Sequence, residues 1–249
     1  MTTAPAADQR RLLDVQELDT RLDQLAHKRR TLPELARLAE LDAQLADLHT
    51  ALVTSRTAAE DLRRELTKAE ADVEQVRSRA ARDQARLDSG QGSAKDLQAL
   101  TSELASLARR QGDLEEVELE VMERLEAHEG ALAEVTKAYD ALVAQKESVA
   151  ADRDAAFRTI DADAERVRGE RAKAAEGLDA GLVTLYERLR GQLGGLGAAP
   201  LRGRRCEGCR LELNPLDLDA IRSKGEDQVV RCEECGRILV RLPEPAAAG

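Results

Sequence analysis

The chain has 249 residues, a formal net charge of −10, 35% charged residues and 1% aromatic residues. Because a typical globular domain is about 25% charged and fills its core with aromatic side chains, this composition argues against a large globular core and a mostly strand-built fold. It favours long helices that pack along a narrow seam, and the acidic charge argues against general binding to polyanions.

The N-terminal segment carries no recognisable targeting signal. Met1–Ala7 contains neither the basic region nor the apolar stretch of a signal peptide. No apolar run in the chain approaches the ~18 residues that a membrane span requires. We therefore expect a cytoplasmic protein without a membrane partner.

Three helical segments are predicted before the first cysteine: Asp8–Arg30, Glu34–Asp88 and Lys95–Arg190. Glycine is absent from the first two segments and sparse in the third. Pro33 separates the first two segments and suits the first position of a helix after a break in the chain. Residues 1–190 are thus predicted to form a short N-terminal helix followed by two long ones.

The second segment repeats apolar residues every seven positions. Alternating steps of three and four from Leu38 reach fifteen positions, of which thirteen are apolar. The fifteen positions are Leu38, Leu41, Leu45, Leu48, Leu52, Ser55, Ala59, Leu62, Leu66, Ala69, Val73, Val76, Ala80, Asp83 and Leu87. A strict seven-residue repeat is typical of a supercoiled helix with a narrow seam.

The third segment continues this pattern. From Leu97 to Leu142 the frame holds fourteen positions, of which eleven are apolar, and it weakens beyond Leu142. His128 lies on the frame, and we interpret it as a tolerated seam residue rather than a ligand. The charged residues outside the frame are interpreted as the solvated faces of a coiled coil.

A short break separates the two long segments. Gly90 suits the position after a helix C-terminus, and Ser93 with Asp96 resembles a capping box in which Asp replaces the usual Glu. A two-glycine break between heptad segments predicts an antiparallel hairpin with its tip near residues 89–94. The alternative, a continuous coiled coil between two chains, would not need this break.

The segment lengths predict how the first helix packs. The third segment exceeds the second by roughly the length of the first, so Asp8–Arg30 is expected to pack against roughly Ala150–Glu176. At about 1.5 Å per residue, the hairpin would form a rod of about 100 Å or more.

Four cysteines lie near the C-terminus. They follow a glycine-rich segment, residues 191–200, that we predict to be a hinge. Cys206 and Cys209 form one Cys-x2-Cys pair, and Cys232 and Cys235 form a second after a spacer of twenty-two residues. Two such pairs predict a closed structural site for one Zn²⁺ per chain, because each pair places two thiolates on one side of a tetrahedron. An iron site of the rubredoxin kind and two disulfides remain the alternatives.

The residues around the cysteines predict a zinc ribbon over residues 201–243. Gln228–Arg231 and Arg237–Leu242 contain β-branched residues and are predicted as strands, and Asn214 is expected to cap a short helix in the spacer. A segment of this size without aromatic residues is expected to need the metal in order to fold. Residues 244–249 are predicted to form a disordered tail.

Six arginines near the cysteines are candidate nucleic-acid ligands: Arg202, Arg204, Arg205, Arg210, Arg231 and Arg237. They would give the ribbon a positive face if its strands bring them together. Two observations argue against this function, since residues 200–245 hold nine Lys or Arg against nine Asp or Glu, and no aromatic residue for base stacking. The alternative is that these are ordinary surface arginines.

Motifs of common enzyme classes are absent from the sequence. It contains no phosphate-binding P-loop, no nucleophile elbow and no His-Glu-x-x-His zinc-protease motif. All three histidines, at positions 27, 49 and 128, lie in the predicted helices rather than beside the cysteines. We therefore expect a protein that is not an enzyme and has no small-molecule substrate.

The order of these features resembles the bacterial family of zinc-ribbon proteins that have four cysteine ligands and a long coiled-coil hairpin. The most specific matches are the runs Tyr186–Arg190, Cys206–Cys209 and Cys232–Leu239. Lys95–Leu100 resembles the family's hairpin-tip signature, although Lys-Asp stands here where Lys-Glu is more frequent. The resemblance implies a mostly α fold, a long antiparallel coiled-coil hairpin with a small C-terminal β zinc ribbon.

The resemblance also implies a non-enzymatic role in binding nucleic acid or a transcription factor. We expect an adaptor that binds a protein partner through its hairpin and acts in transcriptional regulation. Lys95, Asp96 and Gln98 are the candidate contacts at the tip. The alternative is a protein that binds RNA or DNA through the arginines of the ribbon.

Overall fold

The computed structural model describes residues 2–242. The chain divides into two compact units, the ribbon unit (Met1–Leu35 with Ala151–Gly249) and the hairpin unit (Ala36–Ala150). These limits differ from the predicted domains, because the first helix and the end of the third segment belong with the cysteines. The predicted tail, residues 244–249, lies outside the described residues.

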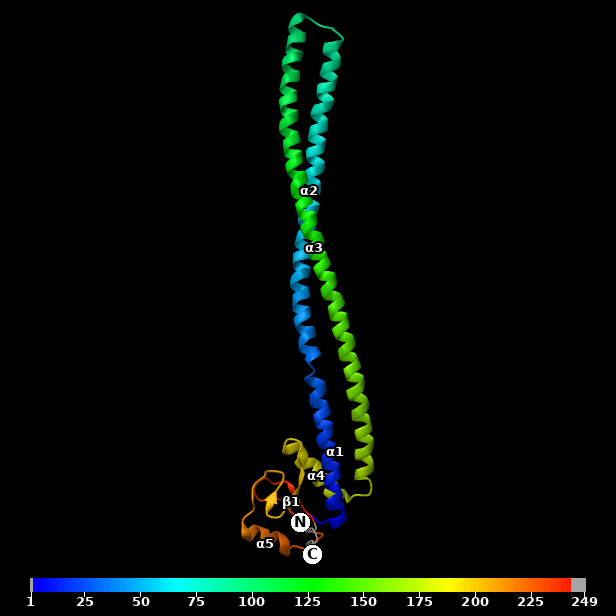
Figure 1. The fold of residues 1–249 in the computed structure, drawn as a ribbon, viewed down its shortest axis with the longest axis vertical. Coiled ribbons are helices and arrows are strands. Elements are labelled where there is room, and N and C mark those ends of the chain that lie inside the picture. The colour runs from blue at the N-terminus through cyan, green and yellow to red at the C-terminus, as the bar shows by residue number, and fades with distance from the viewer. Residues whose placement is uncertain (1, 243–249) are drawn as a thin grey trace, which may run out of the picture. The chain divides into compact units, whose positions relative to one another are not determined.

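The hairpin unit consists of most of α2 (Pro33–Asp88) and the first part of α3 (Ala94–Ala175), two long helices. The two helices run antiparallel and are joined by a turn at residues 89–93 (Figure 1). Near the turn, Arg79 of α2 forms an ion pair with Glu103 of α3 at 2.8 Å. The predicted hairpin and the position of its tip are therefore confirmed.

A narrow apolar seam joins the two helices. Every buried residue of α2 lies on the predicted seven-residue frame: Leu38, Leu41, Leu52, Ala59, Leu62, Ala69, Val73 and Val76. In α3, the frame residues Leu107 and Val121 are buried as well. The interpretation of a heptad seam is confirmed, and the faces outside the seam are left to solvent.

Two polar residues of the seam face each other. The His128 Nε2 atom lies 3.1 Å from the Ser55 carbonyl oxygen and 3.3 Å from the Ser55 Oγ atom. The imidazole therefore has polar partners inside the seam, which agrees with its interpretation as a seam residue.

The tip is closed by backbone geometry and by a reciprocal cap. Gly90 adopts a φ of 64°, the left-handed conformation that glycine favours after a helix C-terminus. Ser93 N donates to Asp96 Oδ2 at 3.0 Å, and Asp96 N donates to Ser93 Oγ at 3.3 Å. The predicted capping box with Asp in place of Glu is therefore present at the start of α3.

The first helix packs against the end of α3 inside the ribbon unit. α1 (Ala6–Arg30) places Arg29 in an ion pair with Asp161 at 2.9 Å. The Arg11 Nη2 atom donates to the Glu176 carbonyl oxygen at 2.7 Å. These contacts confirm the predicted packing of the first helix.

The third predicted segment is two helices rather than one. α3 ends at Ala175, and α4 spans Ala180–Gln192. Gly177 between them adopts a φ of 72°, and Asp179 caps α4 by accepting a hydrogen bond from Leu182 N at 2.8 Å. The prediction of one helix to Arg190 was therefore wrong, because a glycine and a helix cap interrupt it where the apolar frame had already weakened.

A three-stranded sheet with the order β2-β1-β3 lies in the ribbon unit. β1 (Ala198–Arg202) pairs antiparallel with β2 (Arg205–Cys206) and parallel with β3 (Ile238–Arg241). β3 confirms one predicted strand, whereas Gln228–Arg231 makes only isolated bridges. β1 was not predicted, because its first residues lie in the segment that was predicted as a hinge.

The N-terminal residues pair beside this sheet. Ala4 N donates to the Asp227 carbonyl oxygen at 2.8 Å, and Val229 N donates to the Thr2 carbonyl oxygen at 3.1 Å. The buried side chain of Gln9 donates to the Ala4 carbonyl oxygen at 2.8 Å. Residues from opposite ends of the chain thus meet in one compact unit.

A short helix in the spacer supports the cysteines. α5 (Pro215–Ser223) begins at the predicted cap, where Asp217 N donates to Asn214 Oδ1 at 2.8 Å. Ile221 of α5 is buried in the same apolar cluster as Cys206 and Cys232. The helix therefore covers the cysteines from the side of the spacer.

Candidate metal centre

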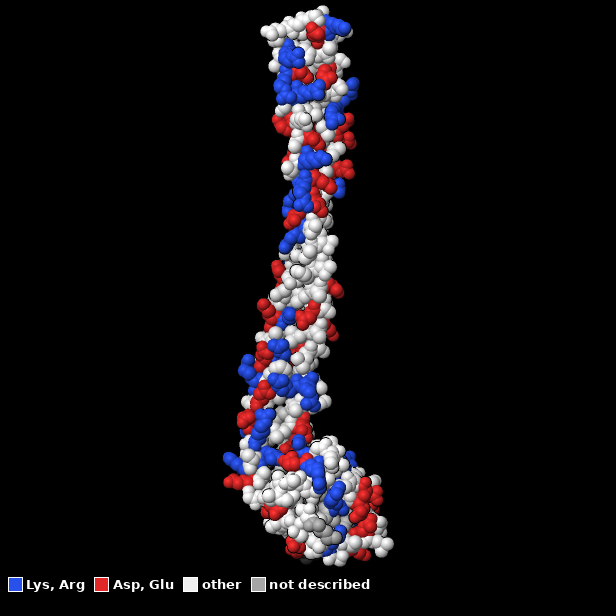
Figure 2. Space-filling model, turned by 180° about the vertical axis from the view of Figure 1, so that it is seen from behind, with Lys and Arg blue, Asp and Glu red and all other residues white. Residues whose placement is uncertain are grey.

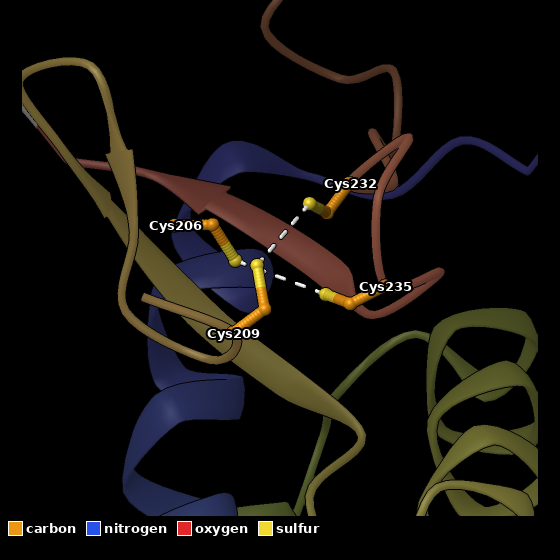
Figure 3. Close-up of side chains that lie close together, drawn as sticks. All are labelled: Cys206, Cys209, Cys232 and Cys235. Carbon is orange, nitrogen blue, oxygen red and sulfur yellow. Dashed lines mark hydrogen bonds between the residues drawn. The ribbon is translucent and has the colours of Figure 1, made fainter. Parts of the chain in front are cut away.

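Two tight loops hold the cysteines. In the first loop, Arg210 N donates to the Cys206 carbonyl oxygen at 2.8 Å. In the second loop, Gly236 N donates to the Cys232 carbonyl oxygen at the same distance, 2.8 Å. Because both loops close with the same hydrogen bond, each turns its pair of thiols toward the other pair (Figure 3).

Gly208 lets the first loop pack closely. A Cβ atom at this position would lie 2.9 Å from the Ala199 Cβ atom and 2.8 Å from the Arg237 Cδ atom. Any larger residue would push the loop away from β1 and from the second cysteine pair. The glycine inside the first Cys-x2-Cys pair therefore serves close packing.

The four sulfur atoms have the spacing of a tetrahedral metal site. All four lie within 4.8 Å of one another. The Sγ atoms of Cys206 and Cys235 are 3.9 Å apart, and those of Cys209 and Cys232 are 4.0 Å apart. A zinc ion with Zn–S bonds of about 2.3 Å separates its sulfur ligands by about 3.8 Å. All four thiols are free of disulfides, so they form the ligand set for one Zn²⁺.

The protonation of the thiols depends on their surroundings. Burial raises the pKa of Cys206 and raises the pKa of Cys232 to about 12. Burial also acts to raise the pKa of Cys235, but hydrogen bonds from Arg237 and from neighbouring thiols outweigh it and lower this pKa to about 7. Because zinc binds thiolates, binding of the metal displaces the remaining protons.

Arg237 connects the metal centre to the glycine-rich segment. Its Nε atom donates to the Leu196 carbonyl oxygen at 2.9 Å, and its Nη2 atom donates to the Leu193 carbonyl oxygen at 3.2 Å. From the other side, Gln16 of α1 accepts a hydrogen bond from Gly197 N at 2.7 Å. The segment predicted as a hinge therefore has defined contacts with both α1 and the metal centre, and motion about it stays a prediction.

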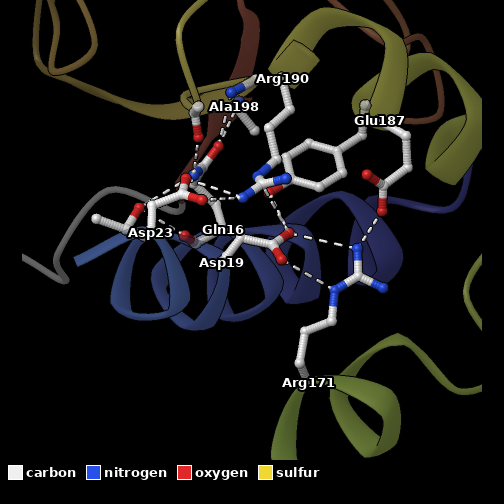
Figure 4. A network of polar contacts seen from close by, with 11 residues as sticks. Gln16, Asp19, Asp23, Arg171, Glu187, Arg190 and Ala198 are labelled. Atoms are coloured by element: carbon white, nitrogen blue, oxygen red, sulfur yellow. Dashed lines mark hydrogen bonds and ion pairs between the residues drawn. The ribbon is translucent and has the colours of Figure 1, made fainter. Parts of the chain in front are cut away.

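A buried polar network joins three helices next to this segment (Figure 4). Asp19, which is 3% exposed, accepts a hydrogen bond from the Tyr186 hydroxyl at 2.7 Å and from Arg171 Nε at 3.1 Å. Arg190 Nε lies 3.7 Å from the same carboxylate, and Arg171 also pairs with Glu187. Burial, together with the hydrogen bond to Asp19, raises the pKa of Tyr186.

This network was not predicted from the sequence. Its signal was present in α1, where Gln16 and Asp19 each lie four residues after a buried apolar residue, Leu12 and Val15 respectively. Polar residues that continue an apolar stripe are expected to be buried and to need partners. The partners of Asp19 come from α3 and α4, and Gln16 bonds to backbone groups of the glycine-rich segment, so no local pattern identifies them.

The structure divides the six predicted nucleic-acid ligands into two groups. One group donates hydrogen bonds to backbone carbonyl oxygens of the ribbon unit: Arg205, Arg231 and Arg237. The other group is exposed, and its side chains make no hydrogen bond or ion pair to any residue in 2–242: Arg202, Arg204 and Arg210. The pairing of β1 with β2 places Arg202 opposite Arg205. The arginines available for a ligand are therefore the second group.

The three predicted tip contacts also differ from one another. Lys95 and Gln98 are exposed, and neither side chain bonds to another described residue. The Asp96 carboxylate accepts hydrogen bonds from Ser93 in the cap of α3. Of the three, Lys95 and Gln98 are therefore the side chains that are free to contact a partner.

Two family descriptions match the chain. Residues 15–194 match the CT398-like coiled coil hairpin domain, and residues 205–239 match the C4-type zinc ribbon domain. The uncharacterized protein Rv2229c of Mycobacterium tuberculosis is 38% identical over 239 residues, which is 96% of this chain and 97% of that protein. The protein ML1638 of Mycobacterium leprae is 29% identical over 222 residues, 89% of this chain and 95% of that protein.

Solved structures show the same architecture. A protein from Mycobacterium smegmatis aligns with a TM-score of 0.85 and 37% identity, covering 96% of this chain and 100% of that one. CT398 from Chlamydia trachomatis aligns with a TM-score of 0.69 and 20% identity, covering 95% and 98%. HP0958 from Helicobacter pylori aligns with a TM-score of 0.51 and 17% identity, covering 99% and 100%. At 20% and 17% identity, the Chlamydia and Helicobacter proteins are similar to this chain in fold alone.

Proposed function

Since the chain belongs to the family of CT398-like coiled-coil hairpin proteins with a C4-type zinc ribbon, we propose that it is a non-enzymatic adaptor that binds a protein partner through its hairpin. The observation that carries this proposal is the narrow seam of the hairpin unit. The two helices bury apolar side chains against each other along one stripe, and their remaining faces are exposed to solvent. Such faces suit recognition of another protein's helix or strand.

The metal centre supports a non-catalytic role. Four thiolates fill the coordination sphere of zinc, so no position is left for a water molecule or a substrate. The matched family descriptions name a hairpin and a ribbon rather than a reaction. In this proposal the zinc holds the ribbon unit in shape.

We also propose a location for the protein and a class of partner. We place the protein in the cytoplasm, because four free thiols persist in a reducing compartment. Within residues 2–242, each helix is too short or too polar to cross a bilayer. The family resemblance implies that the partner is a component of the transcription machinery.

Crosslinking with mass spectrometry in cells tests the adaptor function. The test variant replaces Lys95 and Gln98 with Ala and leaves Asp96 in place, because Asp96 holds the tip together. A matched control replaces Lys137 and Gln44, which are also exposed on the hairpin unit. We expect the wild type and the control to crosslink to the same proteins and the tip variant to lose them.

The outcomes separate the two parts of the proposal. A wild-type protein whose hairpin crosslinks to no other protein would contradict the adaptor function. A tip variant with the same crosslinked proteins as the wild type would remove Lys95 and Gln98 from the binding surface.

The second candidate function is binding of RNA or DNA through the ribbon. The observation that favours it is the exposed group Arg202, Arg204 and Arg210, whose guanidinium groups have no partner in residues 2–242. The test measures RNA and DNA binding by the zinc-loaded full chain across a range of salt, with the three arginines replaced by Gln in a variant. Binding through phosphates weakens steeply with salt, because it releases counterions. This function would be contradicted if no binding occurs at low salt, or if the affinity does not change with salt concentration.

A further inference from the structure

Charge is distributed unevenly along the hairpin unit. Residues 77–110, the distal segment, hold seven Lys or Arg and four Asp or Glu, a net charge of +3. The rest of the hairpin unit, residues 36–76 and 111–150, holds eight Lys or Arg and twenty Asp or Glu, a net charge of −12. The distal segment therefore has a net positive charge, whereas the protein as a whole is acidic.

Four arginines of the distal segment share one flank of the hairpin, which we name the basic flank. Arg79 and Arg110 line the same hollow between α2 and α3. Arg82 and Arg86 follow Arg79 by three and seven residues, which places them on the same side of α2. On the face shown in Figure 2, Lys and Arg side chains gather just below the tip.

The arginines of the basic flank are largely free to bind a partner. Arg82 and Arg110 are exposed and form no ion pair with any residue in 2–242. Arg86 reaches Asp83 only at 4.0 Å, and its side chain is 73% exposed. Arg79 is the exception, because it holds Glu103 at 2.8 Å across the hairpin.

The hollow on this flank combines an apolar floor with a polar rim in which two arginines outnumber one carboxylate. It has a volume of about 240 Å³, its apolar lining is Val76, Leu107 and Leu114, and its polar lining is Arg79, Arg110, Asp72 and Gln75. Val76 and Leu107 are seam residues and are 8% and 5% exposed. The hollow therefore suits an apolar side chain that is flanked by carboxylates.

We infer that the basic flank binds an acidic segment of the protein partner. Carboxylates of that segment pair with Arg82, Arg86 and Arg110, and an apolar side chain enters the hollow between them. This inference rests on the proposed adaptor function, because it names the chemistry of the partner that the hairpin binds. Charge complementarity of this kind sets the rate and specificity of association more than its affinity.

Nucleic acid fits the basic flank less well than an acidic protein segment. The part of α2 in the distal segment, residues 77–88, is only about 18 Å long at 1.5 Å per residue. A longer polyanion that follows the hairpin would reach the acidic remainder of the unit and be repelled. The distal segment also contains no aromatic residue on which bases could stack.

The test measures binding of defined probes to the full, zinc-loaded chain by fluorescence anisotropy. The main probe is a labelled helical peptide of Glu, Leu and Ala, compared with the same peptide carrying Gln for Glu and with a single-stranded RNA of equal charge. The test variant is Arg82→Gln/Arg86→Gln/Arg110→Gln. The control, Arg56→Gln/Lys68→Gln/Lys137→Gln, removes the same charge from exposed positions elsewhere in the hairpin unit.

We expect the acidic peptide to bind the wild type and the control equally and the test variant about tenfold more weakly. Added salt should weaken the binding, because the pairs are exposed. Equal binding by the test variant, equal loss in the control, or binding of RNA in preference to the acidic peptide would overturn the inference.

Crosslinking of the same variants in cells distinguishes this inference from the adaptor function. If the test variant keeps every crosslinked protein of the wild type, the basic flank is not the contact, while the adaptor function stands. If the wild type itself crosslinks to no protein, the adaptor function fails.

Discussion

At the scale of single residues, the thiols of the metal centre couple zinc to protons. Cys232 is 2% exposed, and its burial raises its pKa to about 12. Cys235 lies beside Arg237 and has a pKa lowered to about 7. Without metal at neutral pH, Cys232 therefore keeps its proton, whereas Cys235 is partly ionised.

The apparent zinc affinity is predicted to fall steeply with acid. Cys206 and Cys232 hold protons in the metal-free protein, because burial raises their pKa values. Each proton that zinc must displace lowers the apparent affinity about tenfold for every pH unit of acidification. Because two thiols hold protons, the apparent affinity is expected to fall at least about a hundredfold from pH 7 to pH 6. Competition with a chelating dye at both pH values measures this. An affinity that changes less than tenfold would contradict the assignment of thiol ligands.

Asp19 is predicted to contribute more to stability than any single partner in its network. Asp19→Ala leaves the Tyr186 hydroxyl and Arg171 without their buried acceptor and is expected to cost about 3–5 kcal/mol in the free energy of unfolding. Tyr186→Phe removes one hydrogen bond and is expected to cost about 1–2 kcal/mol.

Urea denaturation of the full chain measures both effects. Asp14→Ala serves as the control, because Asp14 is an exposed residue of the same helix. A loss in Asp19→Ala no larger than in the control would show that the network does not stabilise the fold.

The sequence predicted the residues of the metal centre but not those that surround it. The spacing of Cys206, Cys209, Cys232 and Cys235 is a local pattern with one favoured geometry. Gln16 and Arg237 support this site through backbone groups of the glycine-rich segment. Contacts between a side chain and a distant backbone leave no periodic signal, so sequence reasoning cannot find them.

At the scale of elements, the start of α3 depends on two side chains. Ser93 and Asp96 exchange hydrogen bonds at the tip. The bonds that the Ser93 hydroxyl and the Ser93 amide donate to the Asp96 carboxylate lower the pKa of Asp96. A carboxyl group whose pKa is lowered in the folded state contributes stability that is present at neutral pH. This contribution is lost as the pH falls through the lowered pKa.

Asp96→Ala is predicted to loosen the tip without unfolding the hairpin. Hydrogen exchange at residues 94–97 is expected to become roughly fivefold faster, because the first turn of α3 loses its cap. Asp96→Glu should retain most of the protection, since Glu is the usual residue of a capping box. Asp113→Ala, a change at an exposed residue farther along α3, provides the control. Unchanged exchange in Asp96→Ala would mean that the cap does not hold the tip.

Elements with a strong period were predictable, and elements fixed by distant contacts were not. The buried residues of α2 fall on the predicted frame, because a seven-residue repeat determines which face is covered. The break between α3 and α4 and the strand β1 were missed. Both occur where the apolar frame is weak and where contacts with α1 and β3 determine the conformation.

At the scale of the whole molecule, the chain consists of two units with different bases of stability. The hairpin unit is held by a repeated local seam within one stretch of sequence. The ribbon unit combines two distant stretches with the metal centre. Loss of zinc is therefore expected to affect the two units differently.

Removal of zinc by a chelator is predicted to loosen the ribbon unit beyond the cysteine loops. Gln16 and Arg237 bind the glycine-rich segment, so disorder at the metal centre should reach α1 and α4. Hydrogen exchange of the full chain is expected to accelerate in β1–β3, α4 and α1. It should stay unchanged in residues 36–150. Acceleration restricted to the cysteine loops, or spread evenly over both units, would contradict this coupling.

The pairing of Thr2–Ala4 with Asp227–Val229 has a consequence for synthesis on the ribosome. The N-terminal residues are synthesised before the hairpin unit, and their partners are synthesised after it. The sequence of the hairpin unit lies between them without interruption, so it can fold as soon as it leaves the exit tunnel. Meanwhile the apolar residues of α1, Leu12 and Val15, have no finished core to enter. The first helix of a nascent chain is therefore expected to expose these apolar residues until α4, β1 and β3 have been synthesised.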